Sequence, residues 1–187
     1  MEENLSNASL ISIDILTVID TEYIKAKYGP NNNSPSNPVP IDHNSQFLIC
    51  TDTRGIISGQ GTADLNFRAN AGDLVSFRGT SIYQNSDDAV IVYGIVKNNN
   101  VPKSVDVFNQ FVTNIVERNG AVQPNPKQLN GLPAIQVKQS FLSYDSKVAR
   151  SGMEAFLVNI ALYTMDRTGQ NQVLYGYYSW DPTITVQ

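Results

Sequence analysis

The chain of 187 residues contains one histidine and one cysteine, and these counts limit the chemistry it can perform. Cys50 ends the apolar run 47–50, a setting typical of a buried, reduced thiol. A catalytic thiol would need a nearby base, and His43 is the only histidine available. A blue-copper site needs two histidines and a cysteine, and zinc catalysis fails on the same count unless carboxylates substitute. We therefore expect no catalytic residues, no transition metal and no cofactor.

Three carboxylates offer a weaker alternative, a calcium site. Asp20 and Glu22 follow the first predicted strand, and Asp42 lies beyond a long loop, just before His43. If that loop folds back on the first strand, the oxygens of Asp20, Glu22 and Asp42 form a cluster of the kind that calcium binds. Polar groups at strand ends are usually only solvated, so this second interpretation stays open.

Aromatic residues near the end of the sequence are the best candidates for ligand binding. They are Tyr175, Tyr177, Tyr178 and Trp180, and Asp181 follows them directly. An exposed aromatic ring can cover the apolar face of a sugar, which predicts a carbohydrate site. Aromatic residues are also ordinary strand residues, so a core or sheet-surface cluster is the alternative.

The stretch Ser58–Lys97, which precedes these aromatics, has the clearest strand pattern in the chain. Apolar and polar residues alternate twice, and the turn-forming segment Asn70–Asp73 separates the two alternations. The pattern predicts a β-hairpin. The apolar run Ala89–Tyr93 is typical of a strand covered on both faces. The residues expected to face the core are Leu65, Phe67, Val75, Phe77, Ile91 and Tyr93.

The rest of the chain also reads mainly as strands. Residues 105–118 have helical spacing, but their β-branched and aromatic residues favour a strand. Thr21–Tyr28 is predicted to form one helical turn, and Gly29–Pro40 a long loop, functional or mobile. Strand 10–20 is expected to change register after Ile15. The other predicted strands are 46–52, 132–144, 153–165, 173–180 and 184–186.

About eight to ten short strands without a βαβ repeat predict an all-β, single-domain sandwich of jelly-roll type. We expect the domain to span residues 1–187, with 1–9 frayed. The net charge of −4 and the scattered basic residues argue against nucleic-acid binding. The sequence has no apolar run of about 18 residues and no basic leader, so we expect no membrane insertion and a cytoplasmic location.

Three segments carry a resemblance to a known family. The first is GQGTADLNFRANAGDLVSFRGTS followed by NSDDAVIVYGI, the second is Val18–Glu22, and the third is Gly176–Val186. Together they resemble the AidA/PixA family of bacterial inclusion-body proteins. The resemblance implies a non-enzymatic protein, regulated by cell density or stress, that accumulates in cytoplasmic inclusions and is sometimes linked to host association. Some inclusion members are rich in methionine, but this chain has only three, so a methionine store is not implied.

Self-association is the property that the composition also permits. Charged residues are only 16% of the chain, and such low charge weakens repulsion between copies. We expect a homodimer or a larger assembly, with the terminal strand Tyr175–Trp180 as the contact surface. The alternative function is a lectin-like module that binds carbohydrate or another ligand, which rests on analogy with other jelly rolls.

Overall fold

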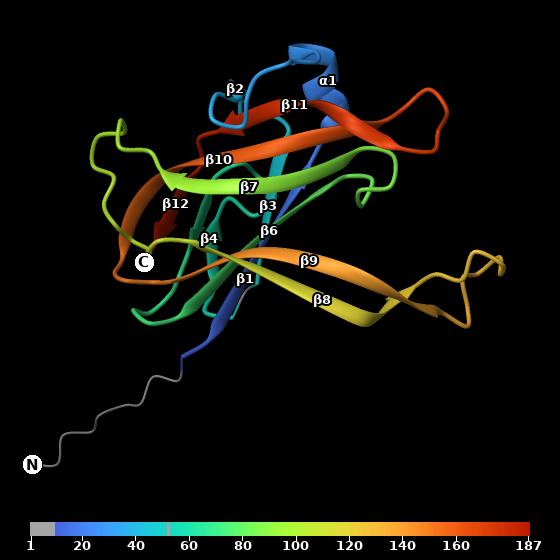
Figure 1. Ribbon diagram of the computed structural model, residues 1–187. Helices are drawn as coiled ribbons and strands as arrows, with labels where there is room; N and C mark the ends of the chain where they lie inside the picture. The colour runs from blue at the N-terminus through green and yellow to red at the C-terminus, as the bar shows by residue number, and fades with distance from the viewer. Residues whose placement is uncertain (1–9, 52) are drawn as a thin grey trace, which may run out of the picture.

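The computed structural model describes residues 10–51 and 53–187. In this part of the chain two β-sheets pack as a sandwich, and one helix lies at one end of it (Figure 1). The prediction of an all-β sandwich is confirmed. The segment expected to be frayed, 1–9, lies outside the described residues. Among the described residues, no helix has the length and apolar character that membrane crossing requires.

The first sheet has five strands in the order β3-β1-β6-β9-β8. β1 pairs in parallel with β6 and antiparallel with β3, and the other pairs are antiparallel. β8 lies at one end of this order and is therefore an edge strand. The strands are β1 (Ser12–Ile19), β3 (Gln46–Cys50), β6 (Leu74–Ser81), β8 (Val112–Gln123) and β9 (Ile135–Lys147).

The second sheet is built around β10 (Gly152–Met165). On one side β10 pairs with β7, and on the other it pairs first with β12 and then with β11. β11 and β12 follow each other along β10 because only Asp181 and Pro182 separate them. The other strands are β2 (Val39–Pro40), β4 (Ile56–Ser58), β5 (Leu65–Phe67), β7 (Ala89–Lys97), β11 (Gln172–Trp180) and β12 (Thr183–Val186).

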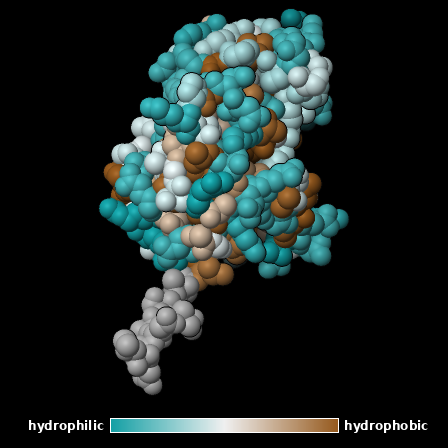
Figure 2. All heavy atoms as spheres, turned by 90° about the vertical axis from the view of Figure 1, so that its left-hand side faces the viewer, coloured by the Kyte–Doolittle hydropathy of each residue, from teal (hydrophilic) through white to brown (hydrophobic). Residues whose placement is uncertain are grey.

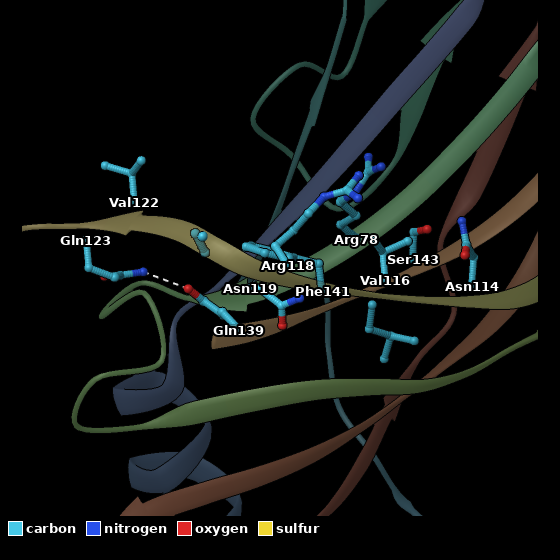
Figure 3. Close-up of a pocket in the computed structure, with 13 residues that line it drawn as sticks. Arg78, Asn114, Val116, Arg118, Asn119, Val122, Gln123, Gln139, Phe141 and Ser143 are labelled. Atoms are coloured by element: carbon cyan, nitrogen blue, oxygen red, sulfur yellow. Dashed lines mark hydrogen bonds between the residues drawn. The ribbon is translucent and has the colours of Figure 1, made fainter. Parts of the chain in front are cut away.

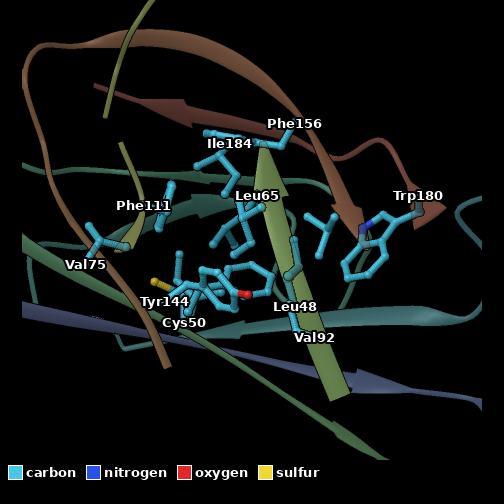
Figure 4. Packing of buried hydrophobic residues seen from close by; sticks show 14 of the residues in the cluster. Leu48, Cys50, Leu65, Val75, Val92, Phe111, Tyr144, Phe156, Trp180 and Ile184 are labelled. Carbon is cyan, nitrogen blue, oxygen red and sulfur yellow. The ribbon is translucent and has the colours of Figure 1, made fainter. Parts of the chain in front are cut away.

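A cluster of apolar side chains fills the space between the sheets (Figure 4). Period-two alternation sends every second side chain of a strand into this space. Four predicted core residues are buried as expected: Leu65, Phe67, Val75 and Phe77. β10 contributes Phe156, Val158, Ile160 and Leu162 from one face, again as predicted.

The predicted hairpin of Ser58–Lys97 is wrong, because its strands lie in different sheets. β5 pairs with β12 and β4 in the second sheet, whereas β6 lies between β1 and β9 in the first. The turn at 70–73 forms, and Gly72 has the left-handed φ of 96° that glycine allows. It leads the chain from the second sheet to the first, and the carboxylate of Asp73 is buried in it. Alternation indicates which side chains point inward, not which strand is the neighbour.

The interpretation of Ala89–Tyr93 as a strand covered on both faces is also wrong. Ile91 is 45% exposed and Tyr93 is only partly buried, while Val90 and Val92 point into the core. β7 is an edge strand of the second sheet, and on its outer face Ile91 is left exposed while Tyr93 contacts the loop at Pro35. The apolar run Ala89–Tyr93 therefore places apolar side chains on both faces of β7, although only the inner face is buried.

Three smaller predictions are corrected in detail. The strand predicted at 105–118 begins only at Val112, and the residues before it form an extended segment that Phe108 anchors through a bridge to Val148. α1 (Thr21–Tyr28) has eight residues rather than one turn, and Asp20 caps its start. β1 shows no register change, so Leu16 points outward.

The loop 29–40 is tied to the second sheet. The side chain of Asn31 donates to the carbonyl of Tyr177 and accepts from its N–H, each at 3.2 Å. The hydroxyl of Tyr93 donates to the carbonyl of Pro35 at 2.7 Å. β2, which the sequence did not predict, pairs with β11. This loop therefore covers part of an edge that would otherwise present unpaired backbone groups.

Candidate functional site

The predicted aromatic site does not form a platform for sugar stacking. Trp180 is fully buried between the sheets (Figure 4). Tyr178 is also fully buried, and Tyr175 and Tyr177 are partly buried. Asp181 is exposed at the end of β11. Alternate residues of a strand point to opposite faces, and the even positions here face the core. The core alternative is therefore correct for the two buried rings. The contact surface expected on the strand Tyr175–Trp180 stays a prediction to which the rings of Tyr178 and Trp180 lend no exposed area.

The three predicted calcium ligands are engaged separately. Asp20 accepts a backbone N–H at the start of α1, Glu22 lies 2.7 Å from the ammonium of Lys25, and Asp42 pairs with Lys27. The hydrogen bond from Lys27 holds the pKa of Asp42 well below its usual range. Residues 10–51 and 53–187 contain no group of three or more His, Cys, Asp or Glu that could hold a metal ion. The oxygen cluster proposed from the sequence does not form.

His43 lies between two carboxylates instead of next to Cys50. Its Nδ1 is 3.2 Å from Asp64 Oδ2, and its Nε2 is 3.0 Å from Asp181 Oδ1. Partial burial opposes protonation of the ring, but the hydrogen bond to Asp181 and the charge of Asp64 outweigh it and raise the pKa of His43. Cys50 is buried, as predicted, and donates to the carbonyl of Thr51 at 3.4 Å. Both ring nitrogens of His43 therefore contact carboxylates, and neither contacts the thiol of Cys50.

The most unusual surface is the β8–β9 hairpin, which sequence reasoning missed. β8 has twelve residues, and nearly all of its side chains are exposed. Several are apolar: Val112 is 59% exposed, Ile115 69% and Val122 68%. Phe141 on β9 adds an exposed ring opposite Val116. The only signal in the sequence is that apolar and polar residues of β8 do not segregate to separate faces, as they do in β6.

A wedge-shaped cavity explains why the inner face of the hairpin is exposed. Figure 1 shows β8 and β9 diverging from β7 and β10, so the sandwich opens toward the end of the hairpin. Its lining includes the buried side chains of Phe77, Val92 and Tyr144, the partly buried Leu142 and the exposed Ile115. The cavity has a volume of about 650 Å³. Its lining is mostly apolar and continues the core into an open space.

The edge of β8 is regular and uncovered from Val112 to Arg118, before its register with β9 shifts. No strand lies beyond it in the described sheet, it contains no proline, and its charged residues are Glu117 and Arg118. The edge of β3 is covered by backbone hydrogen bonds that join Leu48 to Gly61 and Thr62. β7 is the other long edge, and it differs from β8 because its inner face is buried in the core. On the face seen in Figure 2, apolar residues emerge in small groups between polar ones.

Comparison with known proteins gives the chain a family. The model of the PixA inclusion body protein family matches residues 11–186. The crystal structure of an inclusion body protein (PixA) from Burkholderia cenocepacia J2315 has 29% sequence identity and a TM-score of 0.81. That similarity covers 97% of this chain and 99% of the other. No curated protein matches. The resemblance inferred from the sequence is confirmed: the chain belongs to the PixA family of inclusion body proteins.

Proposed function

We propose that this protein is non-enzymatic and self-associating, and that it accumulates in cytoplasmic inclusions. The observation that carries the proposal is the uncovered β8 edge with its exposed apolar side chains. Unpaired N–H and C=O groups on such an edge pair readily with another chain. Closed two-fold dimers are the commonest arrangement, and they bring the same edge of both copies together. Regulation by cell density and a link to host association belong to this proposal through the family resemblance.

A two-fold axis through Ile115 gives the most favourable pairing of β8 with its copy. Residues Val112–Arg118 form the regular part of β8, because the register with β9 shifts only after Arg118. With Ile115 at the axis, Arg118 lies opposite Val112 of the second copy, and Glu117 lies opposite Thr113. An axis at residue 117 or 118 would instead oppose like charges, which destabilises a strand pair. The Ile115 register uses the whole regular segment and opposes no like charges.

Sedimentation of the purified chain over a wide concentration range tests the proposal. The wild type should form dimers or larger species, and Ile115→Lys should weaken association because two cations would face each other at the axis. Val96→Lys is the matched control, since Val96 is 51% exposed on the competing edge strand β7.

Two results would contradict this arrangement in different ways. A wild type that stays monomeric up to about 100 μM, where contacts of about −5.5 kcal/mol begin to populate dimers, would refute self-association. Dissociation by Val96→Lys but not by Ile115→Lys would move the interface to β7 and leave self-association intact.

A further inference from the structure

A second cavity lies on the outer face of the β8–β9 hairpin, and its lining differs from that of the apolar wedge (Figure 3). Its volume is about 560 Å³, and β6, β8 and β9 all contribute to it. The register pairs Asn114 with Ser143, Val116 with Phe141 and Arg118 with Gln139. Residues directly opposite each other in antiparallel strands project to the same face. The two strands therefore place a patterned set of side chains around one concave surface.

Two arginines converge on this cavity from different strands. Arg78 comes from β6 and Arg118 from β8, and Figure 3 shows their guanidinium groups on the same side of the cavity. Arg78 pairs with Asp14. Among residues 10–51 and 53–187, no carboxylate forms an ion pair with Arg118. Asp14 therefore already balances the charge of Arg78, whereas Arg118 brings an unpaired positive charge to the cavity, and guanidinium groups bind carboxylates through paired hydrogen bonds.

The rest of the lining suits a polyhydroxylated ligand. Gln123 donates to the side-chain oxygen of Gln139 at 2.7 Å, which leaves the remaining amide groups of both free for a ligand. Asn114 adds an exposed amide, whereas Ser143 is buried and its hydroxyl bonds to Asp145. Phe141 is 45% exposed and presents an apolar surface beside these polar groups. A sugar matches this lining, because its hydroxyl groups can bond to the polar side chains and its apolar C–H face can pack against the aromatic ring.

We infer that this cavity binds an anionic saccharide, with the sugar carboxylate held by Arg118 and Arg78 and the sugar ring placed against Phe141. This binding site is independent of self-association, because strand pairing at the β8 edge leaves the sheet face uncovered. It also lies at a distance in sequence and structure from the buried aromatic residues from which carbohydrate binding was predicted. No covalent step is involved.

Calorimetric titration of the full chain with the trisaccharide of galacturonic acid tests the inference. The wild type should bind this ligand, and its neutral methyl ester should bind about tenfold or more weakly because the charged hydrogen bonds are lost. Arg118→Gln should weaken binding of the acid by a similar factor without changing that of the ester. Lys138→Gln is the control, because Lys138 is an exposed cation on β9 that pairs with Glu117 instead of lining the cavity.

Four outcomes would overturn the inference. These are no binding by the wild type at millimolar ligand, equal affinity for acid and ester, equal losses in Arg118→Gln and Lys138→Gln, and binding of inorganic sulfate as tight as that of the trisaccharide. The last outcome would indicate a simple anion site with no contribution from the sugar. Thermal unfolding of each variant confirms that the exposed substitutions leave the fold intact.

Discussion

Arg54 holds the buried carboxylate of Asp73 through two contacts, with Nη2 2.9 Å from Oδ1 and Nε 2.5 Å from Oδ2. The same carboxylate accepts the backbone N–H of Asn70 at 2.7 Å and that of Ile11 at 3.1 Å. It thereby joins the chain before β1, the turn before β6 and the segment before β4. The hydrogen bonds from Arg54 hold the pKa of Asp73 below its usual range, although burial opposes the shift.

This lowered pKa gives a pH-dependent prediction. A carboxyl group with a lowered folded pKa stabilises the protein above the ordinary value of about 4, and this contribution is lost as the pH falls through the folded pKa. The difference in unfolding free energy between wild type and Asp73→Asn should therefore be largest near neutral pH and shrink below about pH 4. Urea denaturation at several pH values measures it. A difference that stays constant across this range would contradict the prediction.

Glu154 should behave in the opposite way. Its carboxylate is buried and accepts the N–H groups of Val107 and Phe108 at 2.8 and 2.9 Å, yet burial outweighs these bonds and raises its pKa. The folded state then binds this proton more tightly than the unfolded state, so the contribution to stability falls as the pH rises between the two pKa values. Glu154→Gln should gain stability relative to wild type as the pH rises through that window. A difference in unfolding free energy between the two proteins that does not change with pH would contradict the prediction.

His43 offers a direct spectroscopic check because it is the only histidine. Its imidazole NMR signals should titrate with a pKa above the ordinary value of about 6.5. The stability that Asp64 and Asp181 provide to the protonated ring is present below that value and is lost as the pH rises through the folded pKa. Asp181→Asn should lower the measured pKa of His43, since it removes the carboxylate on Nε2. An unchanged titration in this variant would exclude the contact.

The core assignment can be tested with one matched pair of substitutions. Phe77 is buried between the sheets, so Phe77→Ala should lower the unfolding free energy by about 3–5 kcal/mol. Ile91→Ala should have a much smaller effect because Ile91 projects from the outer face of β7. Chemical denaturation of both variants under the same conditions gives the comparison. Similar losses for the two substitutions would show that the faces of β7 are assigned wrongly.

The inward-facing residues were predictable where apolar and polar residues alternate cleanly. Leu65, Phe67, Val75 and Phe77 are examples, because burial of every second residue leaves a periodic trace in the sequence. The pairing of strands was not predictable in the same way. β5 and β6 carry the same alternation, but they belong to different sheets. Partner choice depends on contacts between distant residues, and a local pattern does not record them.

The candidate surfaces were the least predictable part. Trp180 and Tyr178 suit a ligand platform as well as a core, because aromatic residues occur in both. The outcome depends on which face of β11 packs against the core, and both residues lie on that face. Ile115 and Phe141 have the composition of core residues, but the sandwich opens before it can cover them. Arg78 and Arg118 lie far apart in the sequence and meet only because β9 joins β6 to β8.

The pairing of β5 with β12 has a consequence for the order in which the protein can fold. Leu65 lies opposite Ile184, and Asp64 accepts the backbone N–H of Thr183, a residue 119 positions later. During synthesis, β5 therefore has to wait for most of the remaining chain before its principal partner exists. Topologies with such distant pairings fold slowly, and their apolar strands stay exposed in the meantime. A nascent chain of this protein is thus open to contacts with neighbouring copies before its own sandwich has closed.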